Sequence, residues 1–153
     1  MLSVWITGAS SGIGEACAYR YAEEGARLVL TSSSVNRLEP VAARCRELGA
    51  TEVSILPYDL TCLDGIEALT DKAWDAMKGI DIVMLNAGIS QRTNVEDTSM
   101  EMVRKIMEIN YFAPVAIAKC LLPKMVGRGY GKIAVTTSIA GRFGFPLRCG
   151  YSS

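Results

Sequence analysis

The sequence predicts a doubly wound α/β domain, in which parallel strands form one sheet with helices on both faces. Five short runs are almost wholly apolar, and stretches with helical apolar spacing separate them. Strands without polar alternation are typical of a parallel sheet that is buried on both faces. A polar or glycine-rich motif follows each run, and ligands in such sheets bind beyond the carboxyl ends of the strands. We therefore expect residues 1–153 to form a single domain with a binding site along one edge of the sheet.

Composition excludes several classes of function. Half of the 153 residues are hydrophobic, and 16 Lys and Arg balance 16 Asp and Glu, so no basic surface for nucleic acid is expected. No stretch approaches the roughly 18 uninterrupted apolar residues of a membrane span, and none is predicted in this chain. The absence of histidine excludes Ser-His-Asp and Cys-His catalysis and most zinc sites, so no metal site is predicted.

The five cysteines indicate a reducing compartment. They are widely scattered and form no Cys-x-x-Cys motif, which is the pattern of free thiols rather than of a disulfide framework. We expect an intracellular protein, either cytoplasmic or, if an anchor precedes Leu2, associated with the endoplasmic reticulum.

The first expected strand and helix flank a glycine-rich motif. The apolar run Val4–Ile6 leads into Thr7-Gly8-Ala9-Ser10-Ser11-Gly12-Ile13-Gly14, and a helical pattern follows from Ile13 to Ala26. Glycines permit a tight turn and close approach of the backbone to a pyrophosphate, and the helix N-terminus offers N–H groups to that anion. The motif predicts a dinucleotide site; the alternative is a tight turn in an unrelated α/β protein.

The second strand is expected over Arg27–Thr31 and is followed by the serines Ser32–Ser34. Asn36 and Glu39 form a capping-box pattern at the start of the next helix. Pro40 fits best in the first turn of a helix, so this helix is expected to start late.

The rest of the chain repeats the order of strand, polar motif and helix. Helices are expected from Ile66 to Met77 and from about Ser99 to Met125. The expected strands, each with its motif, are Glu52–Tyr58 before Asp59-Leu60, Asp81–Leu85 before Asn86-Ala87-Gly88, and Lys132–Thr137 before Ser138.

Taken together, these motifs resemble the short-chain dehydrogenase/reductase family, and within it the corticosteroid-dehydrogenase-like branch. The resemblance runs from Val4 to Ser153. It rests on the Thr7–Gly14 motif, on Asp59-Leu60, on Asn86-Ala87-Gly88, on Asn110 in the long helix, and on Ser138 with Tyr151 thirteen residues later.

The resemblance implies a Rossmann fold that binds a nicotinamide dinucleotide. The pyrophosphate would lie on the glycine turn, the adenine would contact Asp59, and the adenosine half would lie over the end of strand four. The implied cofactor-binding residues are Thr7, Gly8, Ser10, Ser11, Gly12, Ile13, Gly14, Asp59, Leu60, Asn86, Ala87 and Gly88. One position departs from the family, because its paired asparagine is Leu85-Asn86 here.

The residues after strand two favour NADP over NAD. The end of strand two has no acid to accept a hydrogen bond from the 2′-hydroxyl of NAD, and so nothing at this position repels a 2′-phosphate. The arginine that many NADP-using members carry is absent from Ser11, Ser33 and Ser34. The hydroxyls of Ser32 and Ser33, together with Arg37 one turn into the next helix, could bind that phosphate.

The implied catalytic residues are Asn110, Ser138 and Tyr151. Ser138 would hydrogen-bond a substrate carbonyl, Tyr151 would pass the proton, and Asn110 would hold a relay water in a locally loosened helix. A tyrosine with an ordinary pKa of about 10 needs help to give or take a proton near neutral pH. In the family that help comes from a lysine four residues after the tyrosine, a position that lies beyond Ser153. We therefore expect a reductase that is incomplete at its C-terminus, with strand five left as an exposed apolar edge.

Several alternatives stay open. Asp59 could cap the turn beside Thr61, and Asn110 could be a satisfied polar residue in a helix kinked at Pro114. Arg92 could face the cofactor or substrate, although a solvated loop arginine is expected. The whole chain could be a non-catalytic nucleotide-binding or interaction module.

The segment Ile139–Leu147 is expected to line a substrate pocket. Its side chains Phe143, Phe145 and Leu147 favour a lipophilic alcohol or carbonyl as substrate; alternatively they only pack the loop down. The resemblance also implies that the intact protein is a homo-oligomer.

Overall fold

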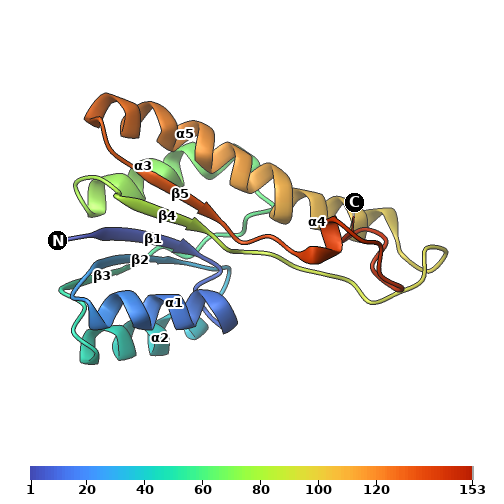
Figure 1. Ribbon diagram of the computed structural model, residues 1–153, viewed down its shortest axis with the longest axis horizontal. Helices are drawn as coiled ribbons and strands as arrows, with labels where there is room; N and C mark the ends of the chain where they lie inside the picture. The colour runs from blue at the N-terminus through green and yellow to red at the C-terminus, as the bar shows by residue number, and fades with distance from the viewer. Residues whose placement is uncertain (153) are drawn as a thin grey trace.

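One parallel sheet of five strands runs through the middle of the computed structural model, which describes residues 1–152 (Figure 1). The strand order is β3-β2-β1-β4-β5, and every neighbouring pair is parallel. The predicted doubly wound sheet is therefore confirmed, and the chain reverses its direction of winding between β1 and β4. The strands are β1 Ser3–Thr7, β2 Arg27–Thr31, β3 Glu52–Ile55, β4 Ile82–Leu85 and β5 Lys132–Val135.

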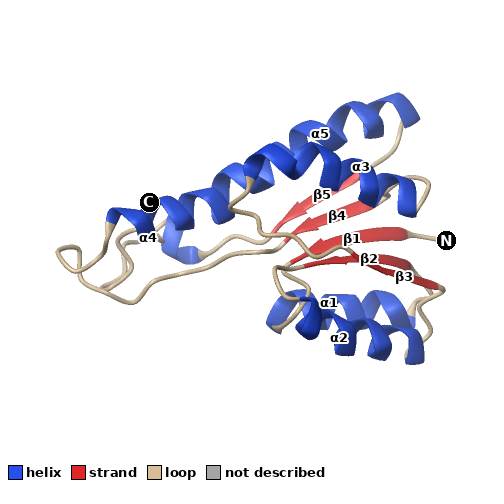
Figure 2. Ribbon diagram, turned by 180° about the vertical axis from the view of Figure 1, so that it is seen from behind, coloured by secondary structure: helices blue, strands red, loops and turns tan. Residues whose placement is uncertain are grey.

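Helices cover both faces of the sheet (Figure 2). Helices α1 (Gly12–Glu23) and α2 (Val35–Glu47) lie on one face, and α3 (Ile66–Ala76) and α5 (Ala113–Arg128) lie on the other. Each face has its own apolar core because successive strand residues point to opposite sides. Along β1, Val4 and Ile6 are buried under α1 and α2, whereas Trp5 is buried under α3 and α5.

A single continuous helix, longer than expected, runs from Met100 to Arg128. It consists of α4 (Met100–Met107), a π-helical segment (Glu108–Phe112) and α5. Ser99 Oγ caps its start by accepting from the N–H of Met102 at 3.1 Å, and Gly129 ends it with a φ of 74°.

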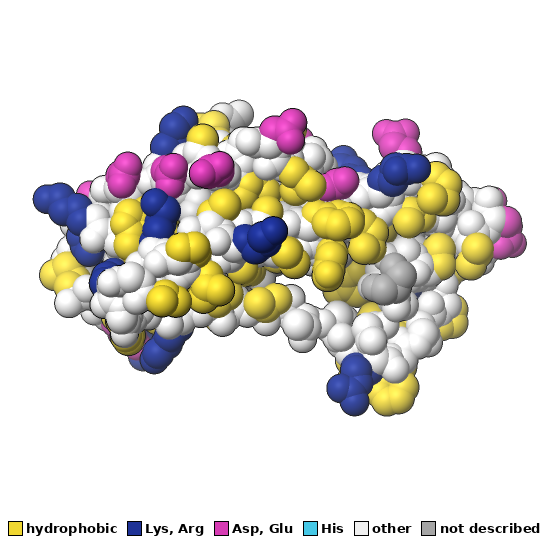
Figure 3. All heavy atoms as spheres, turned by 90° about the horizontal axis from the view of Figure 1, so that it is seen from above, with side chains coloured by type: hydrophobic (Ala, Val, Ile, Leu, Met, Phe, Trp, Pro, Cys, Tyr) yellow, Lys and Arg dark blue, Asp and Glu magenta, His cyan; other side chains and the backbone are white. Residues whose placement is uncertain are grey.

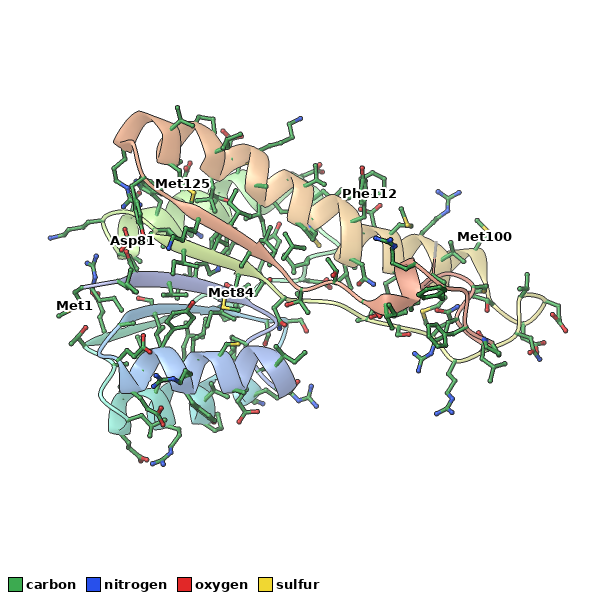
Figure 4. The ribbon with its side chains drawn as sticks, in the orientation of Figure 1. Met1, Asp81, Met84, Met100, Phe112 and Met125 are labelled. Atoms are coloured by element: carbon green, nitrogen blue, oxygen red, sulfur yellow. The ribbon has the colours of Figure 1, made fainter. Side chains whose placement is uncertain are left out.

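By length and composition alone, this 29-residue helix is long and apolar enough to cross a membrane. The expectation that the chain has no such segment is therefore not confirmed. One side of α5 packs into the core through Ala113, Ile117, Leu121 and Met125, and Figure 4 shows Met125 turned toward the sheet.

Apolar side chains are also exposed on the outer surface of this helix. Figure 3 shows hydrophobic side chains spread over the face that contains it. The exposed members include Tyr111, Phe112, Val115, Leu122 and Val126.

Several expected boundaries are wrong. Helix α2 begins at Val35 with Ser34 as its N-cap residue, so Asn36 is not the cap and Pro40 lies inside the helix. Helix α1 ends at Glu23 instead of Ala26, because Gly25 takes a left-handed conformation with a φ of 72°.

Another of these boundaries concerns β3, which ends at Ile55 rather than at residue 58. Hydrogen bonds to the β2 segment nevertheless continue, from Leu56 N to Leu30 O and from Tyr58 N to Ser32 O, both at 2.9 Å. Strand β5 ends two residues early, at Val135, and its four residues are exposed as expected.

Two segments lie side by side beyond the carboxyl edge of the sheet: loop 89–99 and segment 142–152 (Figure 1). A parallel bridge joins Thr93 to Arg148, with Thr93 N donating to Leu147 O at 3.2 Å. The buried Gln91 adds a hydrogen bond from Nε2 to Cys149 Sγ at 3.3 Å. The C-terminal segment, which contains Tyr151, is thereby fixed against the loop that follows β4.

Candidate functional site

A cavity of about 720 Å³ lies along the carboxyl ends of the strands. Segments that follow each of the five strands contribute to its lining, as expected for a site at the point where the winding reverses. The predicted site residues that line it are Gly8, Ser10, Ser11, Ile13, Ser32, Ser33, Arg37, Asp59, Leu60, Asn86, Ala87, Gly88, Asn110, Ser138 and Tyr151. Thr7, Gly12 and Gly14 do not line it and instead form part of its support.

The glycine turn requires glycine for two different reasons. Gly8 and Gly12 have φ values of 66° and 58°, which L residues with side chains rarely adopt. A Cβ on Gly14 would lie 2.3 Å from the carbonyl oxygen of Gly8, and one on Gly8 would lie 2.7 Å from Ala87 Cα. The turn is therefore packed so closely against both its own helix and the end of β4 that a side chain at Gly8 or Gly14 would not fit.

The N-terminus of α1 faces this turn with free hydrogen-bonding capacity. Ser11 is its N-cap residue, has an extended backbone and makes no side-chain cap hydrogen bond. The first N–H groups of a helix have no partner within the helix and carry a partial positive charge. They can therefore bind an anionic group such as a pyrophosphate.

Thr7 and Asn86 join three strands beneath the cavity. The N–H groups of Asn86 and Ala87 both donate to Thr7 Oγ1 at 3.1 Å. The Asn86 side chain donates from Nδ2 to the carbonyls of Thr7 (3.3 Å) and Gly8 (3.4 Å) and accepts from Thr136 Oγ1 at 2.9 Å. This network fixes the ends of β1, β4 and β5 relative to one another.

One end of the cavity contains Ser32, Ser33, Arg37 and Asp59. The two Ser32 hydrogen bonds are local: Oγ accepts from the N–H of Ser34 and donates to its carbonyl, both at 3.3 Å. Arg37 lies in the first turn of α2 and lines the cavity together with the serines that follow β2, where the sequence has no acid.

Asp59 both lines the cavity and caps the turn after β3. Its Oδ1 accepts from the Thr61 N–H at 3.0 Å and from Thr61 Oγ1 at 2.8 Å. The backbone hydrogen bond, and after it the hydroxyl hydrogen bond, lower the pKa of Asp59 below its ordinary value. Asp59 therefore caps the turn with a single carboxylate oxygen, and its contact with an adenine stays a prediction.

Asn110 lies in the π-helical segment, so the expected loosening of the helix is present. Its side chain forms a pair of hydrogen bonds with Ile89: Oδ1 accepts from the Ile89 N–H at 2.9 Å and Nδ2 donates to the Ile89 carbonyl at 2.8 Å. Pro114 has no N–H to donate four residues back to the Asn110 carbonyl. The side chain thus holds loop 89–99 to the helix, while the residue also lines the cavity.

Ser138 and Tyr151 line a wall that is shared by two cavities. Both line the 720 Å³ cavity, and both line a second one of about 520 Å³. Ser138 Oγ accepts from the Ala140 N–H at 3.1 Å, which leaves its own hydrogen available to a ligand. Tyr151 is half-buried, and the Arg148 guanidinium carbon lies 6.0 Å from the centre of its ring.

The second cavity is lined mostly by the segment between these two residues. Phe145 and Leu147 line it as expected, but Phe143 is 64% exposed and lines neither cavity. Arg92 also lines it, and this arginine is exposed in a loop as expected.

Sequence reasoning missed several lining residues. Tyr58 and Thr136 line the first cavity, and Ser90 and Arg148 line the second. Tyr58 directly precedes Asp59, and its hydroxyl donates to the Cys62 carbonyl. Thr136 directly follows β5, just as the predicted motifs follow the other strands. Its position in the sequence could therefore have identified it as a lining residue.

A family model described as short chain dehydrogenase matches residues 3–153. The chain is 44% identical over 151 residues to human dehydrogenase/reductase SDR family member 7 and 38% identical over 156 residues to mouse member 7B. These alignments cover 97% and 98% of this chain but 44% and 47% of the relatives. The chain therefore spans less than half the length of these two relatives.

Two solved structures have closely similar folds. An alcohol dehydrogenase from Thermococcus sibiricus, complexed with 5-hydroxy-NADP, superposes with a TM-score of 0.91 at 33% identity, covering 99% of this chain and 64% of that one. A metagenomic short-chain oxidoreductase in complex with NADP gives a TM-score of 0.93 at 27% identity, covering 99% and 68%.

Proposed function

The chain belongs to the short-chain dehydrogenase family, and from this premise we propose that it carries the cofactor site and the Ser–Tyr pair of an NADP-dependent oxidoreductase. The reaction we propose is the interconversion of a lipophilic alcohol and its carbonyl by hydride transfer. The observation that carries the proposal is the wall shared by the two cavities, because a cofactor in one and a substrate in the other would meet at Ser138 and Tyr151.

The residues of the first cavity fit a nicotinamide dinucleotide. Gly8, Ser10 and Ser11 line the cavity beside the N-terminus of α1, whose N–H groups can bind a pyrophosphate. Ser32, Ser33 and Arg37 suit a 2′-phosphate, and the serines that follow β2 stand where an acid would bind the 2′-hydroxyl of NAD. Both solved relatives described above were bound to NADP or a derivative of it.

The chemistry follows from what the Ser–Tyr pair can donate. When bound, the nicotinamide supplies or accepts the hydride. Ser138 would donate a hydrogen bond to the substrate oxygen, stabilising negative charge as it develops there. Tyr151 would give a proton to that oxygen in reduction and take it back in oxidation. The apolar side chains of Phe145 and Leu147 would hold a lipophilic substrate beside the pair.

The proposal is tested by replacing Tyr151 with Phe in the full-length protein. Reduction of dicarbonyl or steroid ketones with NADPH should be abolished, while NADPH binding measured by fluorescence titration should persist, because only the hydroxyl is removed. Undiminished turnover would refute the assignment of Tyr151. NADPH binding by the wild-type protein without turnover would favour a nucleotide-binding module instead.

The cofactor preference has a separate test. Arg37→Ala should weaken NADPH binding about tenfold and leave NADH binding nearly unchanged, because a charge-assisted hydrogen bond to the 2′-phosphate is lost. Arg44→Ala is a suitable control, since Arg44 is on the same helix but pairs with Glu47 at 2.9 Å away from the cavity. Equal affinity for both cofactors in the wild-type protein would contradict the preference for NADP.

A further inference from the structure

The second cavity combines an apolar wall with two arginines. Phe145, Pro146 and Leu147 contribute the apolar part, and Arg92 and Arg148 contribute the charge. The backbone bridge between Thr93 and Arg148 brings the two arginine-bearing segments together, with Thr93 N donating to Leu147 O at 3.2 Å. The two arginines therefore belong to adjacent segments of the chain and not to distant parts of the surface.

No acidic residue balances this charge within the described part of the chain. The residues that line the cavity include no Asp or Glu, and the ion pairs found within residues 1–152 involve neither Arg92 nor Arg148. Arg148 donates from Nη1 to the hydroxyl of Ser90, a neutral partner that orients the guanidinium without cancelling its charge. A neutral lipophilic substrate would leave both guanidinium groups without an ionic partner.

We propose that the substrate is a lipophilic oxo acid or hydroxy acid, whose carboxylate binds to Arg92 and Arg148 and whose apolar body lies against Phe145 and Leu147. This inference rests on the proposed function and narrows its substrate class. A guanidinium presents its N–H groups in a planar fork that matches the two oxygens of a carboxylate. The pair of arginines therefore recognises an anionic end that a steroid or simple ketone lacks.

The position of Arg148 links anion binding to the reacting oxygen. Tyr151 N donates to Arg148 O at 3.0 Å, and the guanidinium carbon lies 6.0 Å from the centre of the tyrosine ring. One turn of chain therefore carries both the group that would bind the carboxylate and the group that would pass the proton. A carboxylate held at Arg148 would fix the distance at which the substrate carbonyl reaches Ser138 and Tyr151.

The test compares 4-acetylbenzoate with its methyl ester, two ketones that differ only in the anionic group, as substrates of the full-length protein with NADPH. We expect kcat/KM to be at least about tenfold higher for the acid, a ratio that corresponds to about 1.4 kcal/mol of charge-assisted binding. Arg92→Gln and Arg148→Gln should each lower the ratio of acid to ester, mainly by raising KM for the acid. Arg148→Lys should restore part of the ratio.

Arg142→Gln is the matched control, because Arg142 is an exposed arginine of the same segment that lines neither cavity. A ratio near one in the wild-type protein, or an equal fall in the Arg142 variant, would overturn the inference. If neither these ketones nor dicarbonyl or steroid ketones are reduced, the proposed function fails, and ligand-observed NMR then decides the anion site by itself. Binding of 4-acetylbenzoate that is lost in Arg148→Gln supports the site, whereas equal binding of acid and ester refutes it.

Discussion

Replacing Gly14 would disturb both the glycine turn and the residues that follow β4. A Cβ there would meet the Gly8 carbonyl oxygen at 2.3 Å and the Asn86 amide nitrogen at 2.7 Å. Backbone and a hydrogen-bonded side chain cannot move aside as the end of a flexible side chain can. The close approach therefore couples the N-terminus of α1 to the end of β4.

We expect Gly14→Ala to lower the free energy of unfolding by about 1–3 kcal/mol, the usual cost of overpacking, and to weaken NADPH binding. Urea denaturation and fluorescence titration would measure the two effects. Gly127→Ala is the control, because Gly127 lies in α5 with nothing within 4 Å of its added Cβ. That variant should gain roughly 0.5–1 kcal/mol, since alanine is favoured over glycine within a helix. Equal effects of both substitutions would contradict this account.

The Asp59 carboxylate provides a prediction about pH. Its folded pKa is lowered by Thr61, so the stabilisation is present above the ordinary value of 3.8 and is lost as the pH falls through the lowered pKa. Thr61→Val removes the hydroxyl hydrogen bond and keeps the backbone one, so the pKa of Asp59 should rise part of the way to 3.8. Carbon-detected NMR titration of the carboxyl group measures the shift, and an unchanged pKa would show that the hydroxyl contributes nothing.

At the scale of single residues, the sequence predicted the backbone motifs better than the side-chain partners. Gly8 and Asp59 could be located because each follows an apolar run, and the carboxyl ends of parallel strands converge. For Arg92 the sequence left two positions open, because its place depends on the bridge between Thr93 and Arg148, which joins segments 55 residues apart in sequence. No local pattern encodes such a contact.

Among the elements, the π-helical segment has the clearest role, because it holds loop 89–99 through Asn110. Two hydrogen bonds of 2.9 and 2.8 Å join that side chain to the backbone of Ile89. The sequence indicated a loosened helix here, but it did not reveal that the amide would bind a loop backbone. Helix α2 shows the opposite error, since Pro40 is accommodated within the helix rather than at its start.

We predict that Asn110→Ala will speed hydrogen exchange at the Ile89 amide, because that N–H loses its acceptor. Turnover in the full-length protein should also fall, since the loop that follows β4 loses its attachment to the helix. NMR-detected exchange provides the first readout and NADPH oxidation the second. Asn94→Ala in the same loop is the control, as its side chain makes only an exposed 3.5 Å contact with Asp97. Unchanged exchange at Ile89 would refute the tether.

At the scale of the whole molecule, the sheet has two edge strands, β3 and β5, and the residues of β5 are the more exposed. Strand β5 pairs with β4 through four residues, and its own residues are all exposed, with Ile133 37% and Val135 55% accessible. An unpaired apolar edge strand readily pairs with another chain. This side of the fold therefore governs how copies of the 153-residue chain behave in solution.

We expect the 153-residue chain to self-associate with rising concentration, and Ile133→Lys to reduce this, because a charged side chain on an edge strand opposes strand pairing. Sedimentation velocity measures the change. Ile139→Lys serves as the control, since Ile139 is 62% exposed but lies outside β5. Equal suppression by both substitutions would point to general charge repulsion instead of edge pairing.

The π-helical turn at Glu108–Phe112 also determines what the deletion of one residue from the long helix would do. A π-helical turn is equivalent to one extra residue within an α-helix. Deleting one residue from Glu108–Phe112 would therefore remove the wide turn and restore a regular α-helix, while α4 and α5 would keep nearly the same rotation about the helix axis. Ile106, which is 2% exposed, would stay in the interior together with Ile117. The wide turn itself would be lost, so a single-codon deletion there should cost the attachment of Asn110 to Ile89 and spare the packing of the two halves of the helix.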